Sequence, residues 1–556
     1  MIRRFLVSYL PLAAVLIFSG CAKNDPGSSG YDAPIGADGQ KLMVYNVGNG
    51  AEPQDLDPQV VTGVPESNLL MSLFEGLVTP DPKTLDPVPG MAESWELSDD
   101  GLVYTFHLRE NAKWSNGERI FAEDFVQSYK RMLTPVFAAE YSYLLWFVVG
   151  AEDYNRGKLE DYSKVGFKAL DERTLQVTLN NPTPFFLRIL ATHYSWYPVP
   201  LKVIAQFGSL TDKSTRWTQP GNFVSNGPFQ LKDWLPNQRI VMERNPHYWD
   251  AETVKLDQIR FYPTEDISSE ERTFRTGQLD KTNELPNAKV DAYRKNYPES
   301  LRIEPYLGIY YYRLNVTRPP LDDKRVRKAL ALAIDRDSLV RNVTRGGQDP
   351  AYAVSYPGTA GYTARAQLTG DLAEAKRLLA EAGFPNGENW PHVELLYNTS
   401  ENHRAIAEAI QQMWRTNLGI NVQLTNQEWK VYLDSQDNQD YWVQRAGWIA
   451  DYVDPNVFLE IWTTGNLNND TGWSNAEYDQ LAAAALKAKN DNDRYEIYQQ
   501  MDAILVDELP VIPIYYYKRV YAMNPKVKGY WPTLLDNHPV KYIYIEEEPE
   551  PAAESE

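Results

Sequence analysis

The sequence predicts a layered α/β protein of more than one domain, and three observations support this fold class. The chain has 556 residues, too many for one hydrophobic core, so we expect two to four domains. Short runs with alternating apolar residues predict strands, and longer runs with apolar residues three or four positions apart predict helices. In the second half a helix, a glycine and a strand follow one another repeatedly, which is typical of α/β domains.

The first half contains mainly predicted strands. Alternating apolar residues bounded by Asp, Asn and Gly predict strands at 41–47, 102–108 and 174–179. The turn-forming tripeptide Asn-Gly-Pro precedes a predicted strand at 229–231, and 240–243 is expected to be its neighbour. These strands supply sheets for the predicted α/β layers.

The second half contains the clearest helices. One is capped by Asp371, carries apolar residues along one face and stops at Gly383. A second runs from 404 to 418 and stops at a glycine, and a strand at 420–424 follows at once. Further elements are predicted as helices at about 323–334, 475–488 and 492–508 and as an apolar strand at 511–517.

The composition limits the classes of partner. The net charge is −20 and the sequence pI is about 4.9. Such a balance repels phosphate backbones and anionic lipid surfaces, so it argues against nucleic acid as a partner. Aromatic residues are abundant, with 36 Tyr, 15 Trp and 18 Phe. They suit a hydrated cavity that holds varied ligands, and they equally suit ordinary cores.

Common motifs of enzymes and metal sites are missing from the sequence. It contains no His-Glu-x-x-His, no phosphate loop ending in Gly-Lys-Ser/Thr and no Gly-x-Ser-x-Gly. Its six histidines form no close pair, which argues against a zinc site, and no carboxylate pair stands out among 75 acids. We therefore predict a protein without catalysis, metal or cofactor. A cell-envelope hydrolase acting on peptides or murein fragments remains the alternative.

The N-terminus is typical of an export signal. Arg3 and Arg4 precede an apolar run at 5–18, and small residues then lead into Cys21, the single cysteine. This arrangement resembles a bacterial lipobox, so we expect residues 1–20 to be a signal peptide and Cys21 to be lipidated. Residues 21–40 would then form the lipidated cysteine and a flexible tether. No other run reaches ~18 apolar residues, so the lipid is the expected membrane attachment.

The stretch 445–454 combines the groups needed to hold a peptide. Arg445 and Asp451 lie six residues apart, ~20 Å in an extended chain, and Gly447 allows a second backbone to approach. A peptide along this strand would place its ammonium on Asp451 and its carboxylate near Arg445. Main-chain hydrogen bonds in between would be independent of the peptide's sequence. The alternative is an edge strand with an ordinary surface acid and arginine.

Several stretches in a fixed order resemble one protein family. They are GVPESN (63–68), LFEGL (73–77), YTFHLR (104–109), KWSNG (113–117), ERNP (243–246), LYNTS (396–400), NQEWK (426–430) and RAGWIADY (445–452). Together they resemble the family 5 extracellular solute-binding proteins, in particular the oligopeptide-binding branch that serves bacterial ABC peptide importers. The resemblance extends over nearly all of residues 41–545.

The resemblance implies a fold and a function. The fold is the class II periplasmic binding protein fold, with two lobes built from three domains, a hinge and an enclosed ligand cleft. Domain I would comprise 31–74, 201–307 and 518–556, domain II 75–200, and domain III 308–517. The implied function is capture of short oligopeptides in the periplasm or at the cell-envelope surface, with delivery to an inner-membrane permease by a monomeric protein. Binding of dipeptides, haem or glutathione stays open as an alternative.

The resemblance also implies ligand contacts. Asp451 matches the acid that pairs with the peptide's α-ammonium, and Arg445 and His403 match cations that meet its carboxylate. Residues that match backbone-binding strands or pocket walls are Gly63, Val64, Tyr141, Tyr306, Tyr311, Trp429, Leu433, Gly447, Trp448, Ile449 and Tyr517. An ordinary core position is the alternative for the pocket-wall residues, and a solvated position beside a helix start is the alternative for His403.

Overall fold

The computed structural model describes residues 35–36, 39–368, 371–488 and 490–546. The predicted signal peptide, Cys21 and most of the predicted tether lie outside these residues, as does the acidic tail after residue 546. Within the described part, no helix combines the length and the apolar character needed to cross a membrane.

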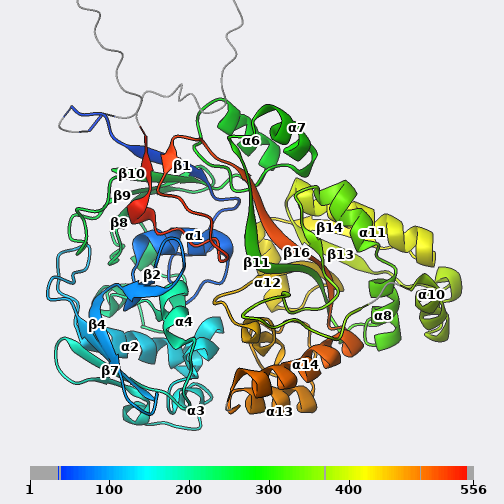
Figure 1. Cartoon of the computed structure of the whole chain (residues 1–556), viewed down its shortest axis with the longest axis horizontal. Coiled ribbons are helices and arrows are strands. Elements are labelled where there is room, and N and C mark those ends of the chain that lie inside the picture. Colours follow the sequence, from blue (N-terminus) through cyan, green and yellow to red (C-terminus); the bar gives the residue numbers. More distant parts are fainter. Residues whose placement is uncertain (1–34, 37–38, 369–370, 489, 547–556) are drawn as a thin grey trace, which may run out of the picture.

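The chain forms two lobes, each built around β-sheets (Figure 1). The first lobe contains two four-stranded sheets and a two-stranded one. Their strands are β1 (Val44–Gly48), β10 (Gln258–Tyr262), β9 (Arg239–Arg244) and β8 (Phe229–Leu235); β4 (Ala92–Leu97), β5 (Val103–Leu108), β7 (Thr174–Thr178) and β6 (Phe167–Ala169); and β2 (Val78–Pro80) with β3 (Pro87–Pro89).

The second lobe is organised on one six-stranded mixed sheet. In spatial order its strands are β12 (Asp349–Pro350), β16 (Val511–Ala522), β11 (Leu301–Leu314), β15 (Val443–Ile449), β13 (Glu394–Asn398) and β14 (Gln423–Gln427). β11 pairs antiparallel with β15 and β16, whereas β13 pairs parallel with β14 and β15. A small pair, β17 (Val527–Lys528) and β18 (Tyr544–Ile545), lies near the end of the chain.

Helices cover these sheets. Those of the first part of the chain are α1 (Val64–Leu73), α2 (Ala122–Leu133), α3 (Ala151–Asn155), α4 (Phe186–Thr192), α5 (Leu201–Ile204), α6 (Ile267–Arg275) and α7 (Val290–Asn296). Those of the second part are α8 (Lys324–Leu332), α9 (Arg336–Leu339), α10 (Leu372–Glu381), α11 (Glu401–Leu418), α12 (Trp429–Asp437), α13 (Ala476–Ala485) and α14 (Asp491–Glu508). The predicted α/β class is confirmed.

Element boundaries follow local capping and burial. Asp371 caps α10 by accepting hydrogen bonds from the backbone N–H groups of residues 373 and 374, and Gly419 ends α11 with φ of 75°. The strand predicted at 420–424 is wrong by three residues, because β14 begins at Gln423. Ile420 and Val422 instead fill the core beside α11 before the strand starts.

β11 and β16 are the longest strands, and they run from one lobe into the other (Figure 1). Leu301–Pro305 pair with residues 518–522, and Ile309–Arg313 pair with residues 511–516. The register shifts between Pro305 and Ile309. The strand predicted at 511–517 therefore continues five residues further than expected.

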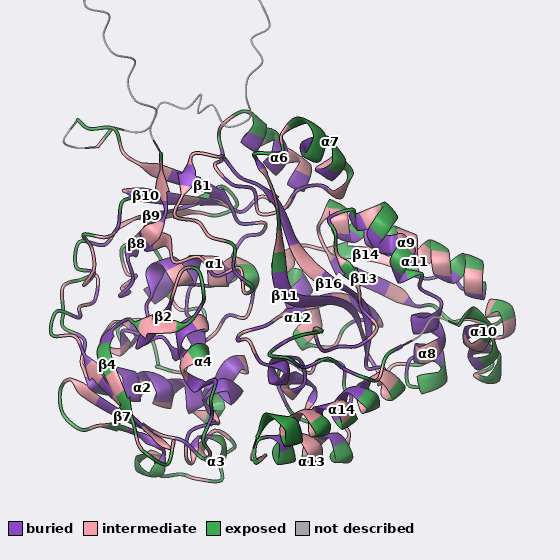
Figure 2. Cartoon of the chain, in the orientation of Figure 1, coloured by how far each residue is buried: buried purple, intermediate pink, exposed green. Residues whose placement is uncertain are grey.

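Buried residues line the interior of both lobes, and exposed ones concentrate on the outer helices (Figure 2). One buried cluster joins the lobes: it contains Phe106 and Trp196 of the first lobe together with Trp448, Tyr452 and Trp462 of the second. The two lobes are thus in direct contact in this structure.

Candidate functional site

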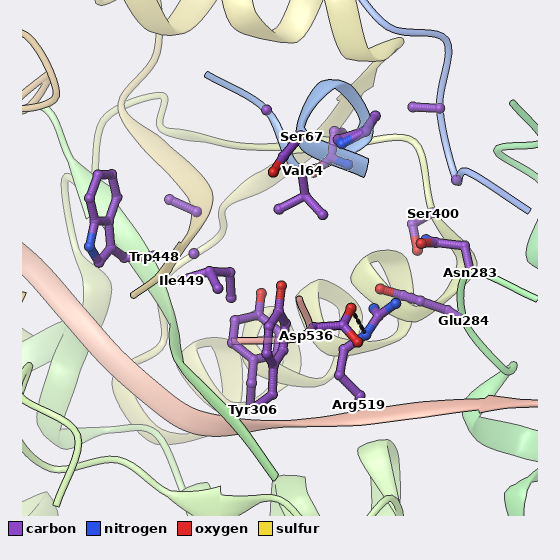
Figure 3. A pocket seen from close by; sticks show the side chains of 18 of the residues that line it. Val64, Ser67, Asn283, Glu284, Tyr306, Ser400, Trp448, Ile449, Arg519 and Asp536 are labelled. Atoms are coloured by element: carbon purple, nitrogen blue, oxygen red, sulfur yellow. Dashed lines mark ion pairs between the residues drawn. The ribbon is translucent and has the colours of Figure 1, made fainter. Parts of the chain in front are cut away.

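A cavity of about 340 Å³ lies between the lobes, within the usual range for ligand pockets. Both lobes line it. The predicted ligand residues that line it are Gly63, Val64, Tyr141, Tyr306, His403, Trp429, Leu433, Arg445, Gly447, Trp448, Ile449, Asp451 and Tyr517. Figure 3 shows Val64 and Ser67 across the space from Tyr306, Arg519 and Asp536.

Tyr311 lies in the core, outside this lining. Its side chain is fully buried and its ring lies 5.6 Å from that of Trp462. Side chains alternate between the faces of a strand, so the preceding Tyr310 is the residue that faces the Arg445 guanidinium, 4.7 Å from the ring centroid. The expectation that Tyr311 forms a pocket wall is therefore corrected.

Asp451 lies two residues after the end of β15 and lines the cavity. Its side chain is 10% exposed, and its Oδ1 lies 3.3 Å from Nε2 of His193. Its Oδ2 is buried and has no hydrogen-bond partner among the described residues. Burial, with a smaller effect from the charge of Glu460, raises the pKa of Asp451 well above its ordinary value. A cationic group would satisfy this free oxygen.

Arg445 supplies a positive charge further along the cavity. Its Nη2 donates to the Tyr517 hydroxyl at 2.6 Å and its Nη1 to Asn398 Oδ1 at 3.3 Å. Burial, and then the charge of Arg445, lowers the pKa of His403 well below its ordinary value. His403 is therefore neutral in this cavity and presents an unpartnered Nδ1, so Arg445 carries the charge that was expected of both.

The strand between these ends has an open edge. The whole of β15, from Val443 to Ile449, pairs with β11 on one edge. On the opposite edge the pairing with β13 stops at Gln444. Among the described strands, none pairs with that edge of residues 445–449, which line the cavity. The Arg445 carbonyl accepts a hydrogen bond from the Tyr432 hydroxyl, and the other main-chain groups on this edge are available to an extended ligand. The alternative of an ordinary edge strand at the surface is therefore wrong.

Gly447 has a different role from the one predicted. A Cβ at this position would lie 2.7 Å from the Tyr517 hydroxyl oxygen, which is closer than real Cβ contacts allow. The glycine therefore makes room for the phenol of Tyr517, which in turn bonds to Arg445. The nearest group is a side chain of the same protein and not a second backbone.

We expect Gly447→Ala to destabilise the protein by about 1–3 kcal/mol, because the added methyl overpacks against Tyr517. The midpoint of urea unfolding measures this change. Adding Tyr517→Phe removes the closest atom and should recover part of the loss. A single variant as stable as the wild type would contradict the packing role.

The sequence did not single out several residues at the site. Thr192 and His193 contact Asp451, Asn398 contacts Arg445, and Arg519 pairs with Asp536 at 2.7 Å on the cavity wall. His193 belongs to no motif, and its partner is remote in sequence. Among the described residues, no group of three or more His, Cys, Asp or Glu is arranged to hold a metal ion.

The fold and this site define a class: a two-lobed α/β binding protein that encloses an extended ligand. A family model for bacterial extracellular solute-binding proteins, family 5, matches residues 86–470. The chain belongs to this family. The fold class expected from the resemblance is confirmed.

Named relatives cover most of the chain. The periplasmic oligopeptide-binding protein OppA of Salmonella typhimurium is 40% identical over 531 residues, 92% of this chain and 94% of that protein. The Escherichia coli murein tripeptide binding protein MppA superposes with a TM-score of 0.87 at 34% identity, covering 92% of this chain and 99% of that one. Haemophilus influenzae OppA in complex with the peptide RPPGFSPFR gives 0.85 at 34% identity, with 91% and 100% coverage. All three are named as binding proteins and none as an enzyme.

MppA also shows that the arrangement of the lobes differs between structures. Its unliganded open form superposes on this chain with a TM-score of only 0.60, at the same 34% identity and with 91% and 98% coverage. The lobes here are arranged as in the first MppA structure and differently from the open one.

Proposed function

We propose that the protein captures short peptides by their termini and backbone and delivers them to a membrane ABC permease, without catalysis. One observation carries the proposal: an open strand edge at 445–449 runs between a buried, partly unpartnered carboxylate and a buried guanidinium. These three features match the groups that all peptides share. The names of the relatives support peptides as the ligand class.

Each group that all peptides share has a proposed partner in the cavity. The α-ammonium would meet Asp451, the backbone would pair with residues 445–449, and the carboxylate would meet Arg445 in shorter ligands. Burying such charges is favourable only when hydrogen bonds complete both ions' shells. Side chains would enter the space beside Trp429 and Leu433, where water adapts the fit at a cost of at most ~2 kcal/mol per molecule.

We further propose that the protein works as a monomer in the periplasm or at the cell-envelope surface, attached through lipid on Cys21. The basic and apolar N-terminal sequence supports export. The OppA relatives of Salmonella typhimurium and Escherichia coli are named as periplasmic proteins. Domains I to III are assigned as the resemblance implies, with the ligand enclosed between I and III.

Mass spectrometry of material released from the purified protein tests the ligand class, and we expect mixed short peptides. Calorimetric titration with Ala-Ala-Ala should show saturable binding, and the peptide should be recovered unchanged after prolonged incubation. Cleaved peptide would indicate a hydrolase instead. Failure to bind any free peptide would refute the proposal.

Binding should also release protons. In the empty cavity burial raises the pKa of Asp451, and a bound ammonium would lower it again. The empty protein therefore holds a proton that the complex lacks, so affinity should rise with pH until the ligand's own ammonium titrates, near ~8. Glu460, with a pKa raised by burial to about 8, and His193, lowered by burial to about 3, are the nearby titratable groups.

Calorimetry in buffers of different ionisation enthalpy counts these protons. We expect release of up to about one proton in the wild type and less in Asp451→Asn. Equal proton release in both proteins would show that another group is titrating.

A further inference from the structure

Asp451 is held from the opposite lobe. The hydroxyl oxygen of Thr192, the last residue of α4, lies 2.5 Å from the Asp451 carbonyl oxygen and 2.8 Å from that of Arg188, and the shorter distance favours donation to Asp451. Nε2 of His193 lies 3.3 Å from the Asp451 carboxylate. Beside them the ring of Phe185 stacks on that of Tyr452, with centroids 5.1 Å apart and planes at 9°. Thr192 and Asp451 are 259 residues apart in the sequence, so these contacts join two distant segments.

The hydrogen bonds of His193 define its tautomer. The backbone N–H of Ser195 lies 3.1 Å from Nδ1 and can only donate, so Nδ1 carries no proton and the Ser195 hydroxyl, 2.8 Å away, donates to it as well. The proton of the neutral ring is therefore on Nε2, which faces Asp451 Oδ1. Tyr141 and Tyr194 hold the ring, with centroids 4.4 and 4.5 Å away.

The ring orients Asp451 without neutralising it. Burial lowers the pKa of His193 to about 3, so the imidazole is uncharged at neutral pH. The groups whose charges reach Asp451 are Glu460 and the tyrosines around His193, and no Lys or Arg of the described residues forms an ion pair with it. An arginine at this position would cancel the charge that a ligand ammonium needs. A neutral donor occupies one oxygen and leaves Oδ2 for the ligand.

We propose that His193 is a positioning residue that completes the ammonium-binding site only when the lobes are closed. This inference rests on the proposed function. The first lobe brings Nε2 of His193 and the hydroxyl of Thr192 to Asp451, and both contacts are lost when the lobes separate. Closure and capture of the ligand's ammonium therefore stabilise each other through a single carboxylate.

Titration calorimetry with Ala-Ala-Ala and with its N-acetylated form tests the proposal. His193→Leu should weaken Ala-Ala-Ala binding roughly 10- to 100-fold, because the polar contact of Nε2 with the charged carboxylate is lost. His193→Gln keeps an N–H donor and should stay within about threefold of the wild type. The N-acetylated peptide has no ammonium, so His193→Leu should weaken its binding clearly less than that of Ala-Ala-Ala.

A double-mutant cycle separates this role from general packing. In an Asp451→Asn background, His193→Leu should change affinity by less than about twofold. Wild-type affinity in His193→Leu, or an equal loss in both backgrounds, would overturn the proposal. If His193→Leu fails to fold, Thr192→Val replaces it: about a threefold loss is expected, and no loss would overturn the coupling.

The outcomes distinguish this inference from the function on which it rests. If the wild type does not bind Ala-Ala-Ala, the proposed function fails. If the wild type binds, Asp451→Asn weakens binding and His193→Leu has no effect, the positioning role alone is refuted.

Discussion

Replacing Asp451 with alanine is expected to weaken tripeptide binding by about 3–5 kcal/mol, a loss of roughly two to three and a half orders of magnitude. The cause is the ammonium that would stay buried without a counter-charge. Among the described residues, the side chain recorded beside the Asp451 carboxylate is His193, which is neutral because burial lowers its pKa to about 3. It therefore does not neutralise the carboxylate, which keeps its charge for the ammonium. Calorimetric titration with Ala-Ala-Ala measures the change.

The N-acetylated tripeptide is the matched control for this prediction. It lacks the charge that Asp451 would bind, so the wild type and Asp451→Ala should bind it with similar affinity. Asp479, an acid outside the cavity lining, provides a control substitution, and Asp479→Ala should bind peptides as the wild type does. A tripeptide affinity unaffected by Asp451→Ala would refute the anchoring role.

Asp57→Ala should destabilise the fold by about 3–5 kcal/mol, because it leaves a buried arginine unpaired. Arg131 on α2 donates two hydrogen bonds to the Asp57 carboxylate, at 2.7 and 3.2 Å. The two side chains are 1% and 3% exposed. The same guanidinium also bonds to Gln59 and to the carbonyl of Leu210. Loss of one carboxylate therefore disturbs three segments of the first lobe.

The midpoint of urea unfolding, followed by circular dichroism, measures this loss. Glu496→Ala is the matched control, because its pair with Arg365 has side chains that are 65% and 64% exposed. Exposed pairs of this kind contribute about 0–1 kcal/mol. Similar effects in the two variants would show that the buried pair contributes no more to the free energy of unfolding than the exposed pair.

The sequence was sufficient for the ends of the site and insufficient for its inner detail. Asp451 and Arg445 were predicted because a contiguous motif carries them, and both line the cavity. Tyr311 was misassigned because the sequence does not show that both faces of this part of β11 are covered, and Tyr310 and Tyr311 are both fully buried in core clusters. Gly447 was interpreted as space for a ligand, because the chain alone does not reveal that Tyr517 fills it.

Contacts across the lobes escaped prediction for a physical reason. His193 has an unremarkable local sequence, and its role depends on a partner brought to it by the packing of distant segments. Similarly, the strand at 420–424 was shifted because Ile420 and Val422 keep the alternating burial of a strand, whereas pairing with β13 begins only at Gln423. Local patterns determine which elements form, and tertiary packing decides where they begin.

The shared strands β11 and β16 act as a single ribbon between the two halves of the molecule. Their register shifts twice, between Pro305 and Ile309 and again between Tyr310 and Tyr311, so the regular pairing is interrupted near the middle of the ribbon. β15 pairs directly with β11, close to this irregular part of the ribbon. Rotation of one lobe about this point would therefore move the outer edges of the lobes further than it would move β15.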